Sequence, residues 1–132
     1  MRLLAGFFTF LVAAMHAGFL AMEMFFWETP FVQKAFNITP EFARETAFMA
    51  ANQGLYNGFL AAGLLWGLAF KKKDVVIFFL LCVIVAGVYG AMSVKPSIFF
   101  IQAVPAMIAL IFTVWAKPRG RVEFAKNVKN PL

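Results

Sequence analysis

The chain has 132 residues, of which 63% are hydrophobic and 14% are charged, and its mean hydropathy is +0.82. A domain of this size leaves much of its surface outside the core, so 18 Phe, 7 Met and 3 Trp are more than it can enclose. The composition therefore argues against a soluble fold and predicts lipid as the main solvent. The net charge of +6 suits the cytoplasmic segments of a membrane protein, so we expect the lipid bilayer and not nucleic acid as partner.

Motifs for common enzyme chemistries are absent from the sequence. Cys82 is the single cysteine, so there is no disulfide framework, redox pair or cysteine-rich metal site. His16 is the single histidine and lacks companion ligands for a metal. No GxSxG, HExxH or glycine-rich phosphate loop occurs. We therefore expect no metal and no cofactor, and we assign no catalytic residue.

Four apolar stretches are long enough to cross a hydrocarbon core of about 30 Å, which takes about 20 helical residues. The first follows Arg2 as a secretory signal would, but it stays apolar as far as Trp27, so we interpret it as a retained anchor. The predicted fold is an all-α integral membrane protein, a four-helix transmembrane bundle that forms a single membrane domain. The predicted spans are 3–27, 47–70, 75–94 and 97–116, with an external loop over 28–46 and a basic cytoplasmic tail over 117–132.

The distribution of positive charge predicts the orientation of this bundle. Short segments rich in Lys and Arg stay in the cytoplasm. One side of the predicted bundle collects nine such residues and the other side three, namely Lys34, Arg44 and Lys95. Both termini are therefore predicted to be cytoplasmic, in the inner (cytoplasmic) membrane of a bacterium. Trp27, Trp66 and Trp115 lie near predicted span ends, as expected for aromatic belts.

The external loop is predicted to end in a helix. Thr39 can cap a helix that has Pro40 at its first position and Glu41 at the positive end of its dipole. We expect this helix to run directly into the second span.

Polar side chains within the spans are the candidate functional groups, because each costs free energy in lipid unless it has a partner. His16 and Glu23 are seven residues apart and share one helix face. Counted at about 1.5 Å per residue, Glu23 and polar residues of the other three helices form one layer in the outer half, with His16 and Asn57 near the midplane. This layer is interpreted as an outward-facing polar cavity or a buried hydrogen-bond cluster. The candidate ligand- or proton-binding residues are His16, Glu23, Asn52, Gln53, Tyr56, Asn57, Tyr89 and Gln102.

Small residues spaced four apart predict close contact between helices. The pairs are Gly54 with Gly58, Gly63 with Gly67, and Ala86 with Gly90. We interpret them as packing devices within the chain, while a homo-oligomer through the Gly54/Gly58 or Ala86/Gly90 face stays open. Pro105 removes a hydrogen bond to the Ile101 carbonyl and is expected to kink the fourth span beside Gln102.

Several blocks of the sequence resemble one bacterial family. The blocks are Glu23–Pro30, Thr39–Ala43, Ala51–Gly63, Gly87–Ala91 and Gln102–Ala106, and they resemble the small four-helix membrane proteins catalogued as domain of unknown function 1304. The resemblance implies an integral membrane protein and the grouping of His16, Glu23, Asn52, Gln53, Asn57, Tyr89 and Gln102. Ala17 and Gly18 replace bulkier residues of that family after the histidine, which widens the space around His16. The resemblance supplies no activity.

Three classes of function follow from these features. The first is binding or transport of a small molecule or ion, with proton exchange at Glu23 and His16. The chain length and the carboxylate on the first helix are similar to those of small multidrug resistance exporters, which is an analogy of architecture alone. The second is an accessory or structural membrane subunit whose polar cluster holds the helices together. The third, least favoured, is a membrane-embedded acid/base enzyme that uses His16 and Glu23.

Overall fold

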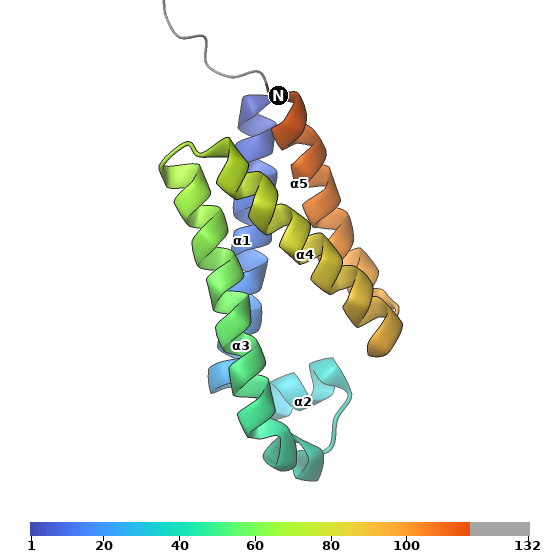
Figure 1. The fold of residues 1–132 in the computed structure, drawn as a ribbon. Coiled ribbons are helices and arrows are strands. Elements are labelled where there is room, and N and C mark those ends of the chain that lie inside the picture. The colour runs from blue at the N-terminus through green and yellow to red at the C-terminus, as the bar shows by residue number, and fades with distance from the viewer. Residues whose placement is uncertain (117–132) are drawn as a thin grey trace, which may run out of the picture.

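The computed structural model describes residues 1–116, and within this range the chain folds entirely into helices and short connections. The helices are α1 (Arg2–Phe25), α2 (Pro30–Phe36), α3 (Pro40–Ala69), α4 (Lys73–Ser93), the π-helical turn η1 (Phe99–Ala103) and α5 (Val104–Trp115). Figure 1 shows α1 beside α3, with α4 and α5 meeting them at the end that carries the N-terminus and diverging from them at the other end. The predicted tail over 117–132 lies outside the described residues.

The all-α prediction is confirmed for the described part of the chain. Two helices, α1 and α4, are long and apolar enough to cross a membrane, and Phe99–Trp115 is a shorter apolar helix. Helix α3 has 30 residues, and Asn52, Gln53 and Asn57 interrupt its apolar stretch. The arrangement of four membrane spans therefore stays a prediction.

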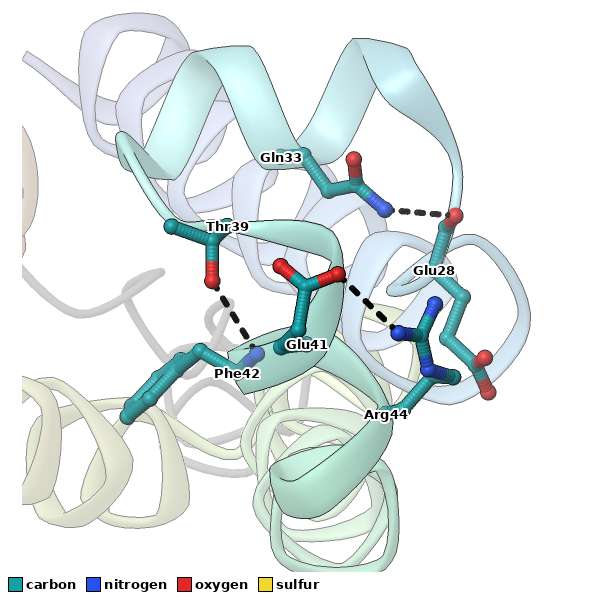
Figure 2. A network of polar contacts seen from close by, with 6 residues as sticks. All are labelled: Glu28, Gln33, Thr39, Glu41, Phe42 and Arg44. Atoms are coloured by element: carbon teal, nitrogen blue, oxygen red, sulfur yellow. Dashed lines mark hydrogen bonds and ion pairs between the residues drawn. The ribbon is translucent and has the colours of Figure 1, made fainter.

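Helix α3 begins where its capping signal predicts. The hydroxyl of Thr39 accepts a hydrogen bond of 3.2 Å from the backbone N–H of Phe42, as Figure 2 shows, and Pro40 occupies the first turn. In the same turn, Glu41 accepts a hydrogen bond of 3.1 Å from Arg44. The Thr39 contact gives a partner to one of the backbone N–H groups that a helix start leaves without one.

The predicted external loop contains a helix that sequence reasoning missed. Helix α2 is capped by Thr29, whose side chain accepts from Val32 N, and it has Pro30 in its first turn. This repeats the Thr-Pro signal of α3. Asn37 ends the helix in a left-handed conformation with φ of 55°. A seven-residue helix is too short for a hydrophobic period to reveal it and depends on tertiary contacts for stability.

Those tertiary contacts centre on Trp27. Its indole N–H donates a hydrogen bond of 3.1 Å to the Thr46 hydroxyl on α3, and its ring packs edge-on against Phe36 of α2, with centroids 5.1 Å apart. Gln33 donates to the Glu28 carbonyl at 2.9 Å, as Figure 2 shows, and Val32 is fully buried. Trp27 therefore holds α2 against the N-terminal part of α3.

Glycines bring the helices together within the chain. A Cβ added to Gly54 would lie 2.7 Å from Cγ of Met24 on α1, and one added to Gly58 would clash with Leu20. The face proposed as one homo-oligomer contact is thus covered by α1, although association of copies stays untested. On the second pair, Gly63 faces Phe79 and Gly67 faces Val76, both on α4. Gly90 faces Ile98, while Ala86 is exposed.

The apolar core lies toward the end of the molecule that carries the N-terminus. It joins buried side chains of α1, α3, α4 and α5, and the rings of Phe8 and Phe112 stack beside it with centroids 5.3 Å apart. Its buried members are Val12, Ala13, Leu64, Val76, Leu80, Val83, Ala106 and Ala109.

The predicted fourth span is two helical segments and not one uniform helix. The π-helical turn η1 precedes α5, and the N–H of Val104 donates to the Phe99 carbonyl five residues earlier. Because Pro105 lacks an N–H, a regular ladder is already broken here. A Cβ added to Gly87 would lie 2.8 Å from the backbone N of Ala103. The π-helical turn includes Gln102, where Pro105 is expected to kink the span, and α4 packs directly on the backbone of this turn.

Candidate functional site

A polar contact joins α3 to the C-terminal part of α1. The side-chain amide of Asn57 donates a hydrogen bond of 2.7 Å to Oε2 of Glu23. Asn57 is 7% exposed, and Glu23 is half-buried. The nearby Gly54 allows the close approach, since a Cβ there would lie 3.0 Å from Cβ of Glu23. The contact brings together two of the predicted site residues.

His16 lies two turns before Glu23 on α1 and is 1% exposed. Its Nδ1 is 2.9 Å from the Val12 carbonyl, so Nδ1 carries the proton and Nε2 is the acceptor in the neutral ring. Within the described residues Nε2 is buried and has no hydrogen-bond partner. The ring packs edge-on against Phe19, with centroids 5.5 Å apart. A buried acceptor without a partner is costly, so a ligand or water that donates to Nε2 would be stabilised there.

Thr9 belongs to the same stripe of α1, and sequence reasoning missed it. Its side chain is fully buried, and its hydroxyl has no partner among the described residues. The signal that could have found it is the spacing, because Thr9, His16 and Glu23 follow one another at intervals of seven residues. This spacing returns to nearly the same helix face.

The structure does not assemble the predicted polar layer from four helices. Tyr56 is 52% exposed and Tyr89 72% exposed, Asn52 and Gln53 are also exposed, and Gln102 is half-buried. These exposed side chains are therefore not closed into one buried cluster within the single chain, and their interpretation as the lining of a polar cavity stays a prediction. The physical reason is that α4 and α5 diverge from α1 and α3 at this end (Figure 1). The roles of all these residues as ligand- or proton-binding groups stay predictions.

A cavity of about 640 Å³ lies at the opposite end of α1 from Glu23. It opens between the start of α1, the end of α5 and the turn from α3 to α4. Among the residues that line it are Arg2, Thr9, Lys71, Lys73 and Thr113. This position differs from that of the predicted polar cavity, which was expected beside Glu23. Within residues 1–116, no three His, Cys, Asp or Glu side chains are grouped as metal ligands.

Comparison with known proteins agrees with the sequence resemblance. A family model described as "Protein of unknown function (DUF1304)" matches residues 10–114, a range that includes every candidate residue named from the sequence. The chain is also similar to the uncharacterized protein YpaA of Lactococcus lactis subsp. lactis (strain IL1403). The two are 26% identical over 115 residues, which cover 84% of this chain and 97% of the relative. No solved structure is a significant match.

Proposed function

Starting from the fact that the chain belongs to the DUF1304 family, whose description assigns no activity, we propose that it is a small four-span protein of the bacterial cytoplasmic membrane. We propose further that it binds a small molecule or ion at Glu23 and exchanges a proton with it. The site itself, and not the family, carries the argument.

Exposed apolar side chains support the membrane placement. Leu3 on α1 is 89% exposed, Phe48 on α3 86%, Met92 on α4 83% and Phe100 in η1 69%. Single exposed apolar side chains are ordinary in soluble proteins, but here they occur on four helical segments, including the two that could cross a membrane. Lipid is the solvent in which such a surface is stable.

The observation that carries the ligand-binding proposal is the state of the Glu23 carboxyl group. A charged side chain in lipid costs about 2.5–3.5 kcal/mol on insertion scales, and one hydrogen bond from Asn57 offsets only about 1–2 kcal/mol of this. Of its two oxygens, only Oε2 receives a described hydrogen bond. A proton or a cationic group at the other oxygen would complete the site.

His16 gives the same stripe a second group that can handle protons. It lies about 10 Å from Glu23 along the helix axis, at 1.5 Å per residue, and its Nε2 is an acceptor without a described partner. A ligand that reaches Glu23 could therefore extend toward His16, or a water could link the two groups. Histidine and carboxylate side chains inside membrane helices are typical of proton pathways.

The test measures proton release when a cation binds to purified protein in liposomes. Tetraphenylphosphonium and sodium are the probes, over pH 5 to 8, with a pH-sensitive dye as readout. We expect wild-type protein to release protons on addition of a probe cation and Glu23→Gln protein to release none, because the amide keeps the size of the side chain but cannot titrate. Glu28→Gln is the matched control, since Glu28 is exposed and lies beyond α1.

A structural role for Glu23 predicts a different result. In that case Glu23→Gln would behave as wild type, because an amide can still accept a hydrogen bond from Asn57, and only Glu23→Leu would destabilise the fold. Wild-type proton release in both variants would remove Glu23 from the mechanism and favour the accessory-subunit alternative.

A further inference from the structure

The cavity beside the N-terminus of α1 combines apolar walls with a cationic rim. Leu3, Leu68 and Val76 contribute to the walls, while the positive charges come from Arg2, Lys71 and Lys73. Among residues 1–116, no acidic side chain lines it. This combination is suited to an amphiphilic anion, because the charged part can stay at the rim while an apolar part packs along the walls.

Two buried hydroxyl groups line the same cavity. Thr9 on α1 is 0% exposed and Thr113 on α5 is 6% exposed, and neither Oγ1 has a hydrogen-bond partner among residues 1–116. A threonine inside a helix can donate its hydroxyl proton to a carbonyl one turn earlier, which these two do not do. Buried polar atoms of this kind normally have a partner, so a ligand that reached these hydroxyls from the cavity would supply the acceptor that both lack.

Lys73 is held in position at the rim by helix α5. Its ammonium group donates hydrogen bonds of 2.8 Å to the Val114 carbonyl and 3.0 Å to the Ala116 carbonyl, at the negative end of the α5 dipole. An ammonium group has three N–H donors, so one donor is left for a ligand. Lys71 lies in the adjacent turn, with φ of 55°, and is exposed.

We propose that this cavity binds the phosphate group of an anionic phospholipid, with the phosphate between the basic rim and the two threonine hydroxyls and an acyl chain along the apolar walls. Phosphate oxygens accept hydrogen bonds and carry the negative charge that this set of donors complements. The end of the molecule that carries Arg2, Lys71 and Lys73 is the predicted cytoplasmic end. Anionic lipids of the cytoplasmic leaflet attract Lys and Arg side chains there. The proposal depends on the membrane placement but not on the chemistry of Glu23, which lies at the other end of α1.

Binding is measured on the full chain in neutral detergent micelles by titration with phosphatidylglycerol or with phosphatidylcholine of the same acyl chains. We expect phosphatidylglycerol to raise the Tm and phosphatidylcholine to leave it unchanged. The variant Thr9→Val/Thr113→Val keeps the shape of both side chains and removes only the hydroxyls. It is expected to keep or raise the Tm without lipid, because no protein hydrogen bond is lost, and to bind phosphatidylglycerol about tenfold more weakly.

Charge variants separate this site from general attraction to anionic lipid. Lys71→Gln is expected to weaken binding of phosphatidylglycerol about threefold to tenfold. The control Lys34→Gln/Lys95→Gln removes two exposed positive charges from the other end of the molecule and is expected to bind as wild type. A loss of affinity in this control equal to that in Lys71→Gln would show that net charge alone attracts the lipid, and would overturn the proposal.

Two further outcomes also contradict the proposal. If the Thr9→Val/Thr113→Val variant folds and binds phosphatidylglycerol as wild type, the hydroxyls do not contact the phosphate. If millimolar inorganic phosphate raises the Tm as phosphatidylglycerol does and competes with it, the ligand is a soluble phosphate and the lipid assignment is wrong. Lys71→Gln still tests the rim if the threonine variant does not fold. Since none of these variants changes Glu23, a negative result leaves the proton-exchange proposal intact.

Discussion

Asn57 on α3 donates a hydrogen bond of 2.7 Å to Glu23 on α1, at the level where Gly54 allows the two helices to approach closely. A polar pair inside an apolar helix interface fixes how the helices are aligned along their axes, because sliding one helix by a turn would leave both groups without partners. The pair therefore specifies the α1–α3 register as well as the position of the carboxyl group.

The first prediction concerns the energy of this pair. Glu23→Leu and Asn57→Leu are each expected to lower the free energy of unfolding by about 1–2 kcal/mol, because each leaves the other group unpaired. The double variant should lose less than the sum of the two, as expected for groups in direct contact. Reversible unfolding in mixed micelles gives the free energy of unfolding of the wild type, the two single variants and the double variant. Gln53→Leu, at an exposed position of α3, is the control, and strictly additive losses would show that the two groups do not interact.

The second prediction concerns the contact between α4 and the π-helical turn. Gly87→Ala places a methyl group 2.8 Å from the backbone N of Ala103, so the backbone has to shift, at a cost of about 1–3 kcal/mol. Gly18→Ala meets no atom within 4 Å and is expected to be neutral or to stabilise α1 by up to about 1 kcal/mol. Thermal unfolding checks that the Tm of Gly87→Ala is below that of Gly18→Ala. Equal Tm values would contradict the packing described at Ala103.

The third prediction concerns pH. Backbone hydrogen bonding at the start of α3, with a smaller contribution from Arg44, holds the pKa of Glu41 below its ordinary value. A depressed folded-state pKa means that Glu41 stabilises the helix start above the unfolded-state pKa, and that this contribution is lost as the pH falls through the folded-state pKa. A carboxyl NMR titration should show a Glu41 midpoint below that of a reference peptide. Arg44→Gln should raise it only in part, because the backbone donors remain.

The fourth prediction concerns topology. Reporter fusions after Lys73 and Leu132 should report the cytoplasm, and fusions near Ala35 and Lys95 should report the outside, because nine of the twelve basic residues lie on the predicted inner side. Replacement of Lys71, Lys72 and Lys73 together by Gln should reduce the fraction of molecules in this orientation. An external reporter signal after Lys73 in the wild-type chain would contradict the orientation proposed here. It would also contradict the placement of the lipid-binding cavity at the cytoplasmic side.

Local signals in the sequence determined where most of the helices lie. The long apolar stretches predict α1, α4 and the segment that ends at Trp115. These helices are predictable because helical hydrogen bonds join residues four positions apart, within one continuous stretch of the sequence. Thr39 and Pro40 define the start of α3 by a hydrogen bond within one turn. The same signal at Thr29 and Pro30 starts α2, and it could have been used in the same way.

Only the tertiary structure decided which polar groups meet. Counting residues gives the height of a side chain along its helix, but not the rotation of that helix or its crossing angle with the next. Those depend on close contacts such as Gly54 with Met24 and Gly87 with Ala103. For this reason Glu23 pairs with Asn57, Tyr89 faces outward, and Thr9 shares a cavity with Thr113, which lies 104 residues later in the chain.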